Sequence, residues 1–341
     1  MKAAVAYGPR DVRIEEVDIP QISDSEVLIR VKAIGVCPSD VRSYEGVYFR
    51  KLYDWGKDSF GLSGHEWSGE IVSVGDEVKG FQVGDRVVGE PIIPCGICKF
   101  CRKGATNLCI DKKLVIRGFA EYLKSPSKSL FKIPEGVSYE AAAFSEPVAA
   151  CLHANEALSP RPGETVLIIG GGPMGLIHLQ LSKLSGATVV LSEVIEDRLM
   201  MARELGADVA VNPTRSDMVK EVKELTDGYG ADGVIVATGA RKAIEDAFNA
   251  VSGGGKVVLF GGSYPPVMVE IDPNLIHYKE IKIMGSYDQT PIHIERALNL
   301  IAKGRIDVER LIAQRLPLSR LKEAFELVKG MKTLKIFIKF D

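Results

Sequence analysis

Residues 163–193 constrain the fold of this chain more than any other stretch. They read GETVLIIGGGPMGLIHLQLSKLSGATVVLSE, which is an apolar strand, a glycine turn, an amphipathic helix and a second apolar strand. Strands that are apolar throughout, without alternation, are typical of a parallel sheet covered by helices on both faces. The stretch therefore predicts a βαβ unit, and with it a doubly wound α/β domain.

The alternation of helices and apolar strands continues to residue 287. The elements expected there are helices over 197–207, 216–228 and 241–251 and strands over 208–212, 232–239, 255–262 and 280–287. Regular succession of this kind is typical of a parallel sheet built from repeated strand–helix units.

The first third of the chain has a different pattern. Residues 12–17 and 26–36 alternate apolar and polar side chains, and residues 69–89 place short valine-rich runs between Gly-Asp turns. Short strands at this spacing predict a small, irregular β-barrel. Beyond the parallel sheet, we expect helices over 291–304 and 318–330 and a last strand over 333–340.

The glycine turn carries the pattern of a dinucleotide site. Residues Gly170 to Gly175 fit G-x-G-x-x-G, with a strand before them and a helix after them. The helix N-terminus then offers free N–H groups to a pyrophosphate. Glu193 ends the next strand, where a carboxylate accepts hydrogen bonds from ribose hydroxyls and repels a 2′-phosphate. The sequence thus predicts NAD rather than NADP, with Arg198 as the one nearby cation that could soften this preference.

Four of the six cysteines lie in one short loop. Cys95, Cys98, Cys101 and Cys109 are spaced C-x2-C-x2-C-x7-C, and in a reducing compartment such clusters usually bind metal. Four thiolates around one Zn²⁺ form a closed tetrahedral site. An iron–sulfur cluster is the alternative, but ferredoxin runs place the fourth cysteine after three residues and follow it with proline. The loop is interpreted as a structural zinc site that leaves the chemistry to other residues.

Charge and hydropathy exclude several classes of partner. The 341 residues carry a net charge of −2, and no lysine or arginine run stands out, so neither nucleic acid nor an anionic membrane is expected. The first residues lack the apolar core of a signal peptide, and no apolar run approaches the roughly 20 residues that span a bilayer. We expect a cytoplasmic protein.

Several further motifs occur in a fixed order along the chain. They are GVCPSD around Cys37, GHEWSGE around His65, the four-cysteine loop, FSEPVAA around Glu146, GGGPMG, and GSY at 285–287. A lone cysteine or histidine is usually a structural residue. Together these motifs closely resemble the zinc-containing medium-chain alcohol and polyol dehydrogenases, over essentially the whole chain.

The resemblance implies a fold of class α/β with two domains. A GroES-like β-barrel catalytic domain would span residues 1–150 and be completed by 287–341. A Rossmann NAD-binding domain would span residues 151–286 between them. Members of the family are usually homodimers or homotetramers that pair the edges of their Rossmann sheets. In this chain the strand around 281–286 could be the edge that pairs with another subunit.

The resemblance also implies a second zinc, so that each chain would hold one catalytic and one structural ion. Cys37, His65 and either Glu66 or Glu146 would surround the catalytic ion, and the sequence does not decide between the two glutamates. Ser39 matches the hydroxyl that begins a proton relay, and Asp40 matches a carboxylate that orients a ligand.

The cofactor and the reaction follow from the same resemblance. Zinc would acidify a bound alcohol, and its hydride would pass to the nicotinamide of NAD, giving a ketone. The residues expected to bind the cofactor are Gly170, Gly172, Pro173, Met174, Gly175, Glu193, Arg198, Thr238 and Ser286.

Two departures from the family limit the choice of substrate. Arg42 stands where many members have histidine, and Ser286-Tyr287 stands where sorbitol-type enzymes have Arg-Tyr. Arg42, Tyr44, Arg117 and Tyr287 could line a polar pocket. We expect oxidation of a secondary alcohol such as a polyol, sugar or diol. The alternatives are an L-threonine 3-dehydrogenase-type reaction, in which Arg42 meets the carboxylate, and a non-catalytic nucleotide-binding scaffold.

Overall fold

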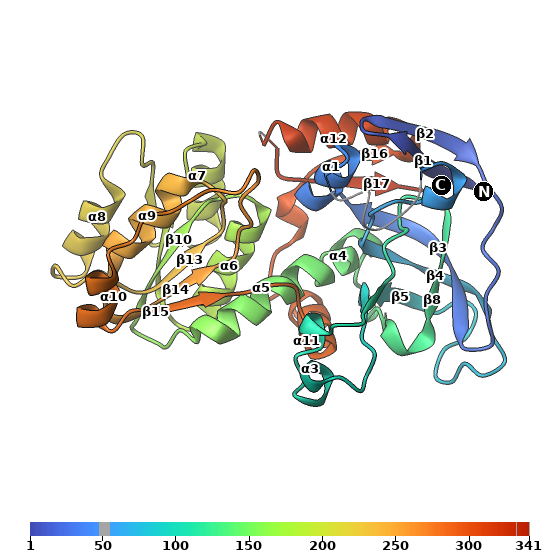
Figure 1. The fold of residues 1–341 in the computed structure, drawn as a ribbon, viewed down its shortest axis with the longest axis horizontal. Helices are drawn as coiled ribbons and strands as arrows, with labels where there is room; N and C mark the ends of the chain where they lie inside the picture. Colours follow the sequence, from blue (N-terminus) through green and yellow to red (C-terminus); the bar gives the residue numbers. More distant parts are fainter. Residues whose placement is uncertain (48–54, 332, 341) are drawn as a thin grey trace. The chain divides into compact units, whose positions relative to one another are not determined.

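The structure is a computed structural model that describes residues 1–47, 55–331 and 333–340. The chain divides into two compact units. The first consists of Met1–Ala149 together with Thr290–Asp341, and the second is Ala150–Gln289. Figure 1 labels their helices and strands.

The second unit contains a six-stranded sheet in which every neighbouring pair of strands is parallel. Its strands are β10 (Thr165–Ile169), β11 (Thr188–Ser192), β12 (Val209–Val211), β13 (Ala231–Val236), β14 (Val251–Leu259) and β15 (Lys282–Gly285). The spatial order β12-β11-β10-β13-β14-β15 is that of a Rossmann domain, with its reversal point between β10 and β13. The predicted doubly wound parallel sheet is confirmed.

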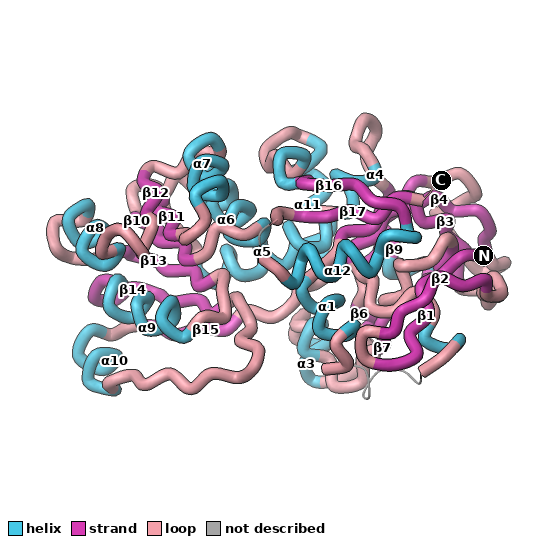
Figure 2. The backbone as a smooth tube through the Cα atoms, turned by 90° about the horizontal axis from the view of Figure 1, so that it is seen from above, coloured by secondary structure: helices cyan, strands magenta, loops and turns pink. Residues whose placement is uncertain are grey.

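Helices cover this sheet on both faces, as the continuously apolar strands require. They are α6 (Pro173–Leu184), α7 (Glu196–Glu204), α8 (Met218–Leu225), α9 (Arg241–Ala250) and α10 (Pro273–Lys279), and α5 (Ser145–Leu158) leads into the unit. In Figures 1 and 2, α8 and α9 lie on one side of the sheet and α6 on the other. Leu167, Val190, Val234 and Val257 are all 1% exposed or less and form the centre of the core.

The first unit is built mainly from antiparallel strands. The strands are β1 (Lys2–Gly8), β2 (Asp11–Glu16), β3 (Glu26–Gly35), β4 (Glu66–Val74), β5 (Arg86–Gly89), β6 (Ile92–Ile93), β7 (Lys113–Leu114), β8 (Tyr122–Pro126), β9 (Leu130–Lys132), β16 (Ile312–Pro317) and β17 (Lys335–Lys339). The main sheet has the order β16-β17-β3-β4-β5-β9, and β8 also pairs with β3. Trp67, Phe119 and Ile71 lie in its core.

Short helices connect these strands. They are α1 (Pro38–Tyr44), α3 (Lys99–Arg102), α4 (Tyr139–Ala143), α11 (Pro291–Ala302) and α12 (Leu321–Lys329), with single turns of 3₁₀ helix at Lys57–Ser59, Thr106–Leu108, Ser127–Ser129, Glu309–Leu311 and Leu318–Arg320. None of the helices in the described ranges is long and apolar enough to cross a membrane.

The end of the chain is an integral part of the first unit. Strand β17 pairs with β3, and Phe337 lies opposite Gly35. On the other side of β3, Gly35 lies opposite Glu66 at the start of β4. Residues from the two ends of the chain therefore meet around one short stretch of β3, where the candidate site is formed.

Candidate active site and nucleotide site

Three potential metal ligands converge in the first unit. One ligand atom each from Cys37, His65 and Glu66 lies within 4.8 Å of the others. Cys37 is the N-cap of α1, while Glu66 is the first residue of β4 and His65 immediately precedes it. Gly35 is required beside them, because a Cβ atom there would collide with the carboxylate of Glu66.

Asp40 fixes the backbone and the side chains of this group. It is fully buried, and its Oδ2 accepts a hydrogen bond from the backbone N–H of Cys37 at 2.8 Å. Its Oδ1 lies 3.3 Å from Nδ1 of His65, and the same ring nitrogen lies 2.8 Å from the carbonyl oxygen of Ser63. Because both neighbours are acceptors, Nδ1 keeps its proton, and Nε2 is the nitrogen that can give its lone pair to a metal once it has released its own proton.

These contacts also affect the basicity of His65. Burial lowers the pKa of this imidazole, but the charge of Asp40 and hydrogen bonds to Asp40 and Cys37 outweigh it and hold the pKa well above 6.5. Ser39, also expected at this site, is partly buried in the first turn of α1.

Lys335 is a member of the site that sequence reasoning missed. Its Nζ donates to both carboxylate oxygens of Glu66 at 2.7 Å, and the two side chains are 4% and 2% exposed. Burial lowers the pKa of Lys335, but the charges of Glu66, Cys37 and Glu146 outweigh it and raise the pKa. The sequence offers little signal for this role, because Lys335 is one of two lysines that flank the apolar residues of the last strand.

Glu146 lies near this group without being part of it. It is in the first turn of α5 and 9% exposed, and its charge acts on Lys335. The three-ligand set of the described residues contains Glu66 and does not contain Glu146.

This donor set fits a catalytic zinc. A thiolate, an imidazole nitrogen and a carboxylate are three of the ligand types that zinc enzymes use, and three protein ligands leave one position for water or substrate. The hydrogen-bonded Nδ1 of His65 is the arrangement expected of a metal-binding histidine. The residues present therefore suit a Lewis-acid centre.

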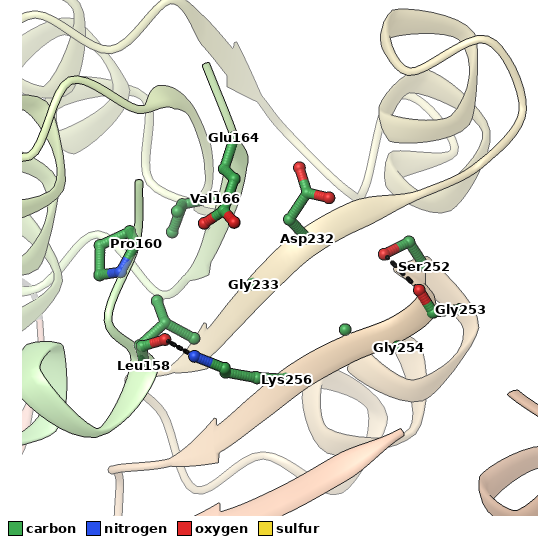
Figure 3. Close-up of a pocket in the computed structure, with 11 residues that line it drawn as sticks. Leu158, Pro160, Glu164, Val166, Asp232, Gly233, Ser252, Gly253, Gly254 and Lys256 are labelled. Atoms are coloured by element: carbon green, nitrogen blue, oxygen red, sulfur yellow. Dashed lines mark hydrogen bonds between the residues drawn. The ribbon is translucent and has the colours of Figure 1, made fainter. Parts of the chain in front are cut away.

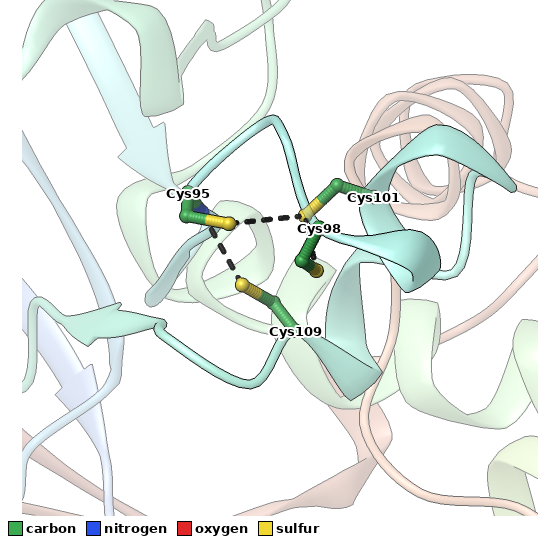
Figure 4. Close-up of side chains that lie close together, drawn as sticks. All are labelled: Cys95, Cys98, Cys101 and Cys109. Atoms are coloured by element: carbon green, nitrogen blue, oxygen red, sulfur yellow. Dashed lines mark hydrogen bonds between the residues drawn. The ribbon is translucent and has the colours of Figure 1, made fainter.

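The four cysteines of the loop form a second potential metal site (Figure 4). Their sulfur atoms all lie within 4.8 Å of one another, with Cys98 and Cys101 at 3.4 Å and Cys95 and Cys101 at 3.9 Å. These separations are too long for a disulfide, and none of the six cysteines, all of which lie in the described ranges, forms one. Backbone N–H groups of Cys101 and Ile110 lower the pKa of Cys98 to about 6, which favours the thiolate that a metal binds.

The paired strands β6 and β7 close this loop at its base. Four sulfur ligands would fill the coordination of a tetrahedral zinc ion and leave no position for a substrate. A structural role follows for it, distinct from the Cys37 group.

In the second unit, the glycine turn joins β10 to α6. Gly170 has φ 108°, which other residues rarely adopt, and a Cβ atom added there would lie close to Ala237 and Thr238, just after β13. A Cβ atom at Gly175 would collide with the carbonyl oxygen of Gly170. Gly172 is the N-cap of the 12-residue helix α6, followed by Pro173 and Met174. The open N–H groups of that helix end suit a pyrophosphate.

Glu193 is held beside this turn. Its Oε2 accepts from the N–H of Gly171 at 2.8 Å, and its Oε1 accepts from the N–H groups of Val194 and Ile195 at 2.7 and 3.0 Å. Arg198 Nη1 lies 3.4 Å from Oε2. The carboxylate is thus fixed at the carboxyl end of β11. These four contacts use about four lone-pair sites, so a ribose hydroxyl that donates to this carboxylate would have to replace one of them.

The other expected cofactor residues lie at the same edge of the sheet. Thr238 follows β13, and Ser286 follows β15 with its N–H donating to the carbonyl of Leu259 at 3.2 Å. The hydroxyl of Ser286 is buried and has no partner among the described residues.

One buried side chain near the turn is unusual. His178 in α6 is fully buried, and neither ring nitrogen has a hydrogen-bond partner within the described ranges. Its ring packs edge-to-face on Phe260 with centroids 4.5 Å apart. Burial lowers the pKa of His178 to about 3, so the ring is neutral in the folded protein at ordinary pH.

Two residues expected in a polar substrate pocket have other roles. Tyr44 is 2% exposed and packs on Phe325 with ring centroids 5.0 Å apart. The guanidinium of Arg117 lies over the ring of Phe60 and donates to the carbonyls of Asp58 and Phe60 at 2.8 and 3.2 Å. Arg42 is partly exposed at the end of α1, and Tyr287 is 57% exposed.

A cavity of about 150 Å³ lies at the opposite edge of the parallel sheet (Figure 3). Its charged groups have internal partners, since Lys256 donates to the carbonyl of Leu158 at 2.6 Å and Asp232 accepts from the N–H of Thr165 at 2.8 Å. In doubly wound sheets ligands bind at the carboxyl ends of the strands, and this cavity lies at the amino ends. It is separate from the nucleotide site.

Comparisons with known proteins agree with this arrangement. Residues 23–135 match the family described as alcohol dehydrogenase GroES-like domain, and residues 173–303 match the family described as zinc-binding dehydrogenase. D-arabitol-phosphate dehydrogenase of Enterococcus avium is 35% identical over 98% of this chain and 95% of its own length. The chain belongs to the zinc-containing medium-chain alcohol and polyol dehydrogenases.

Other members of this dehydrogenase family also match this chain over nearly its whole length. Sorbitol dehydrogenase of Bacillus subtilis is 33% identical over 99% of this chain and 97% of that protein. A zinc-binding dehydrogenase from Sinorhizobium meliloti, solved with NADP bound, superimposes with a TM-score of 0.92 at 30% identity and covers both chains completely. Membership of this family makes the chain an oxidoreductase with a GroES-like domain and a Rossmann domain, as the sequence motifs predicted.

Proposed function

We propose that this dehydrogenase oxidises a secondary alcohol, such as a polyol, sugar or diol, to a ketone and passes the hydride to NAD. The observation that carries the proposal is the convergence of Cys37, His65 and Glu66 in a chain of this family. Zinc, when bound, supplies Lewis acidity that makes an alcohol O–H easier to ionise.

The roles of the chain's own residues follow from their contacts. Cys37 and His65 hold the metal, and Asp40 keeps both in place through the Cys37 N–H and the His65 ring. Glu66 is the carboxylate placed with them, and Lys335 offsets its charge. Ser39 begins the path by which the alcohol proton leaves, and Glu146 adds a second carboxylate nearby.

For the cofactor, the fixed carboxylate of Glu193 supports NAD. A 2′-phosphate would meet a buried negative charge there, and the guanidinium of Arg198, 3.4 Å from that carboxylate, would offset part of the repulsion. The relatives named for arabitol phosphate and sorbitol support a polyol or polyol phosphate as the substrate. Threonine is the second candidate, with Arg42 facing its carboxylate.

Assembly and location belong to the same proposal. Strand β15 is one of the two outer strands of the parallel sheet, and its Ile283 is 40% exposed, which supports a homodimer or homotetramer formed through this edge. Four free thiols that bind metal require a reducing compartment, which supports a cytoplasmic location.

Metal analysis and one variant test the proposal. The purified protein is expected to contain two zinc ions per chain, and Cys37→Ala is expected to retain one. This variant should lose turnover on a panel of sorbitol, arabitol phosphate, butanediols and threonine, read as NADH absorbance, while binding NAD with unchanged affinity. A Cys37→Ala protein that still turned over substrate would exclude the proposed site.

A further inference from the structure

Ser63 stands out by its backbone conformation. It has φ 52°, in the left-handed region that residues with a side chain avoid. Among the non-glycine residues with positive φ in the described part of the chain, Ser63 alone is buried, at 7% exposure. Strained and buried backbone of this kind persists where surrounding contacts enforce it, and it concentrates at functional sites.

Ser63 is connected by hydrogen bonds to both Cys37 and His65. Its hydroxyl donates to Oδ1 of Asp40 at 2.8 Å, and the other oxygen of that carboxylate holds the Cys37 N–H. Its carbonyl oxygen accepts from Nδ1 of His65 at 2.8 Å. One residue thereby touches His65 directly and Cys37 through a single buried carboxylate.

The left-handed conformation makes these two contacts compatible. It directs the carbonyl of Ser63 to the imidazole two residues further on, while the hydroxyl faces α1. Without the hydroxyl, Oδ1 of Asp40 would keep only the 3.3 Å contact with His65, and the carboxylate would be free to turn. Hydrogen bonds of this kind orient metal ligands, and a site that loses them binds its metal more weakly.

We propose that Ser63 is a positioning residue of the metal centre, which sets the ring orientation and the tautomer of His65 and the orientation of Asp40. This inference rests on the proposed function, because it assigns Ser63 to the zinc that Cys37 and His65 would hold. The competing explanation is that the hydroxyl only satisfies the buried Asp40 and supports the fold.

Two substitutions separate these explanations. Ser63→Ala removes the hydroxyl and keeps the strained backbone, whereas Ser63→Gly removes the hydroxyl and adopts a positive φ without strain. Ser59→Ala is the matched control, because Ser59 is also buried in the first unit and, among the described residues, its hydroxyl bonds only to the backbone of Ala6 and Gly56. Cys37→Ala provides the zinc signal of the four-cysteine site alone.

The measured quantities are the zinc dissociation constant, from competition with a chromogenic chelator, the visible spectrum of the Co²⁺-substituted protein, and the melting temperature of the metal-free form. We expect both Ser63 variants to bind the Cys37-dependent zinc about 10–100-fold more weakly and to show a changed Co²⁺ spectrum. Ser59→Ala should bind zinc like the wild type even if it melts earlier. Ser63→Gly should melt above Ser63→Ala while binding zinc as weakly.

Wild-type zinc affinity and an unchanged Co²⁺ spectrum in both Ser63 variants would overturn the role of Ser63 alone. If the wild type instead bound a single zinc that Cys37→Ala did not alter, the proposed metal centre itself would be wrong, and this inference with it. Should Ser63→Ala fail to fold, the Ser63→Gly comparison with Ser59→Ala still decides the question.

Discussion

The buried imidazole of His178 makes the stability of the second unit depend on pH. The folded state keeps this ring neutral down to a pKa of about 3, whereas an exposed histidine in the unfolded chain ionises near 6.5. Below pH 6.5 the unfolded chain therefore binds a proton that the folded chain does not. The contribution of His178 to stability is intact above pH 6.5 and is lost as the pH falls toward 3.

The size of the effect follows from this difference in pKa. Each pH unit between these two pKa values lowers the free energy of unfolding by about 1.4 kcal/mol. Lowering the pH from 7.5 to 5 therefore removes about 2 kcal/mol of stability, and the full range from 6.5 to 3 removes about 5 kcal/mol. In a domain of this size, about 2 kcal/mol corresponds to a melting temperature lower by about 4–8 °C. Replacing the unpaired imidazole by an apolar side chain of similar size should remove the dependence and cost little at pH 7.5.

The test compares wild type with His178→Leu in calorimetric melts from pH 7.5 to pH 5. Protonation of all other groups is common to both proteins, so the difference in melting temperature between them isolates His178. His277→Leu, which removes an exposed histidine from α10 of the same unit, is the control and should follow the wild type. Melting curves of wild type and His178→Leu that fall in parallel with pH would refute the reasoning.

Two further substitutions test the cofactor site and the buried ion pair. Glu193→Ala should weaken the binding of NAD and reduce the discrimination against NADP, measured as the ratio of kcat/KM for the two cofactors. An unchanged ratio would count against the role of Glu193. Lys335→Met should lower the free energy of unfolding of the metal-free protein by about 3–5 kcal/mol, because it leaves the charge of Glu66 buried without a partner. Adding Glu66→Gln to Lys335→Met should recover most of that loss in urea unfolding, and a double variant no more stable than Lys335→Met would contradict this account.

Patterns local in sequence allowed most of the fold to be predicted. The strand, glycine turn and helix of residues 163–193 occur as expected, because unbroken apolar runs and a G-x-G-x-x-G turn leave few alternatives. The four cysteines converge because their spacing within one short loop keeps them close.

Contacts between distant segments were the part that the sequence did not reveal. Lys335 follows Glu66 by 269 positions and meets it only because β17 pairs with β3. Ser63 gave no signal either, since its importance lies in a positive φ that serine rarely adopts. Tyr44 was considered for a polar pocket, but α1 turns it into the core against Phe325.

The pairing of β17 with β3 also has a consequence for synthesis on the ribosome. Residues 150–289 emerge completely before β17 does, so the parallel sheet can form while the barrel still lacks a strand. Until that strand is released, Glu66 lacks the counter-charge of Lys335, and the edge of β3 at Ala33–Gly35 stays open to other chains. The nascent protein is thus most in need of protection in the interval between the release of β4 and the release of β17.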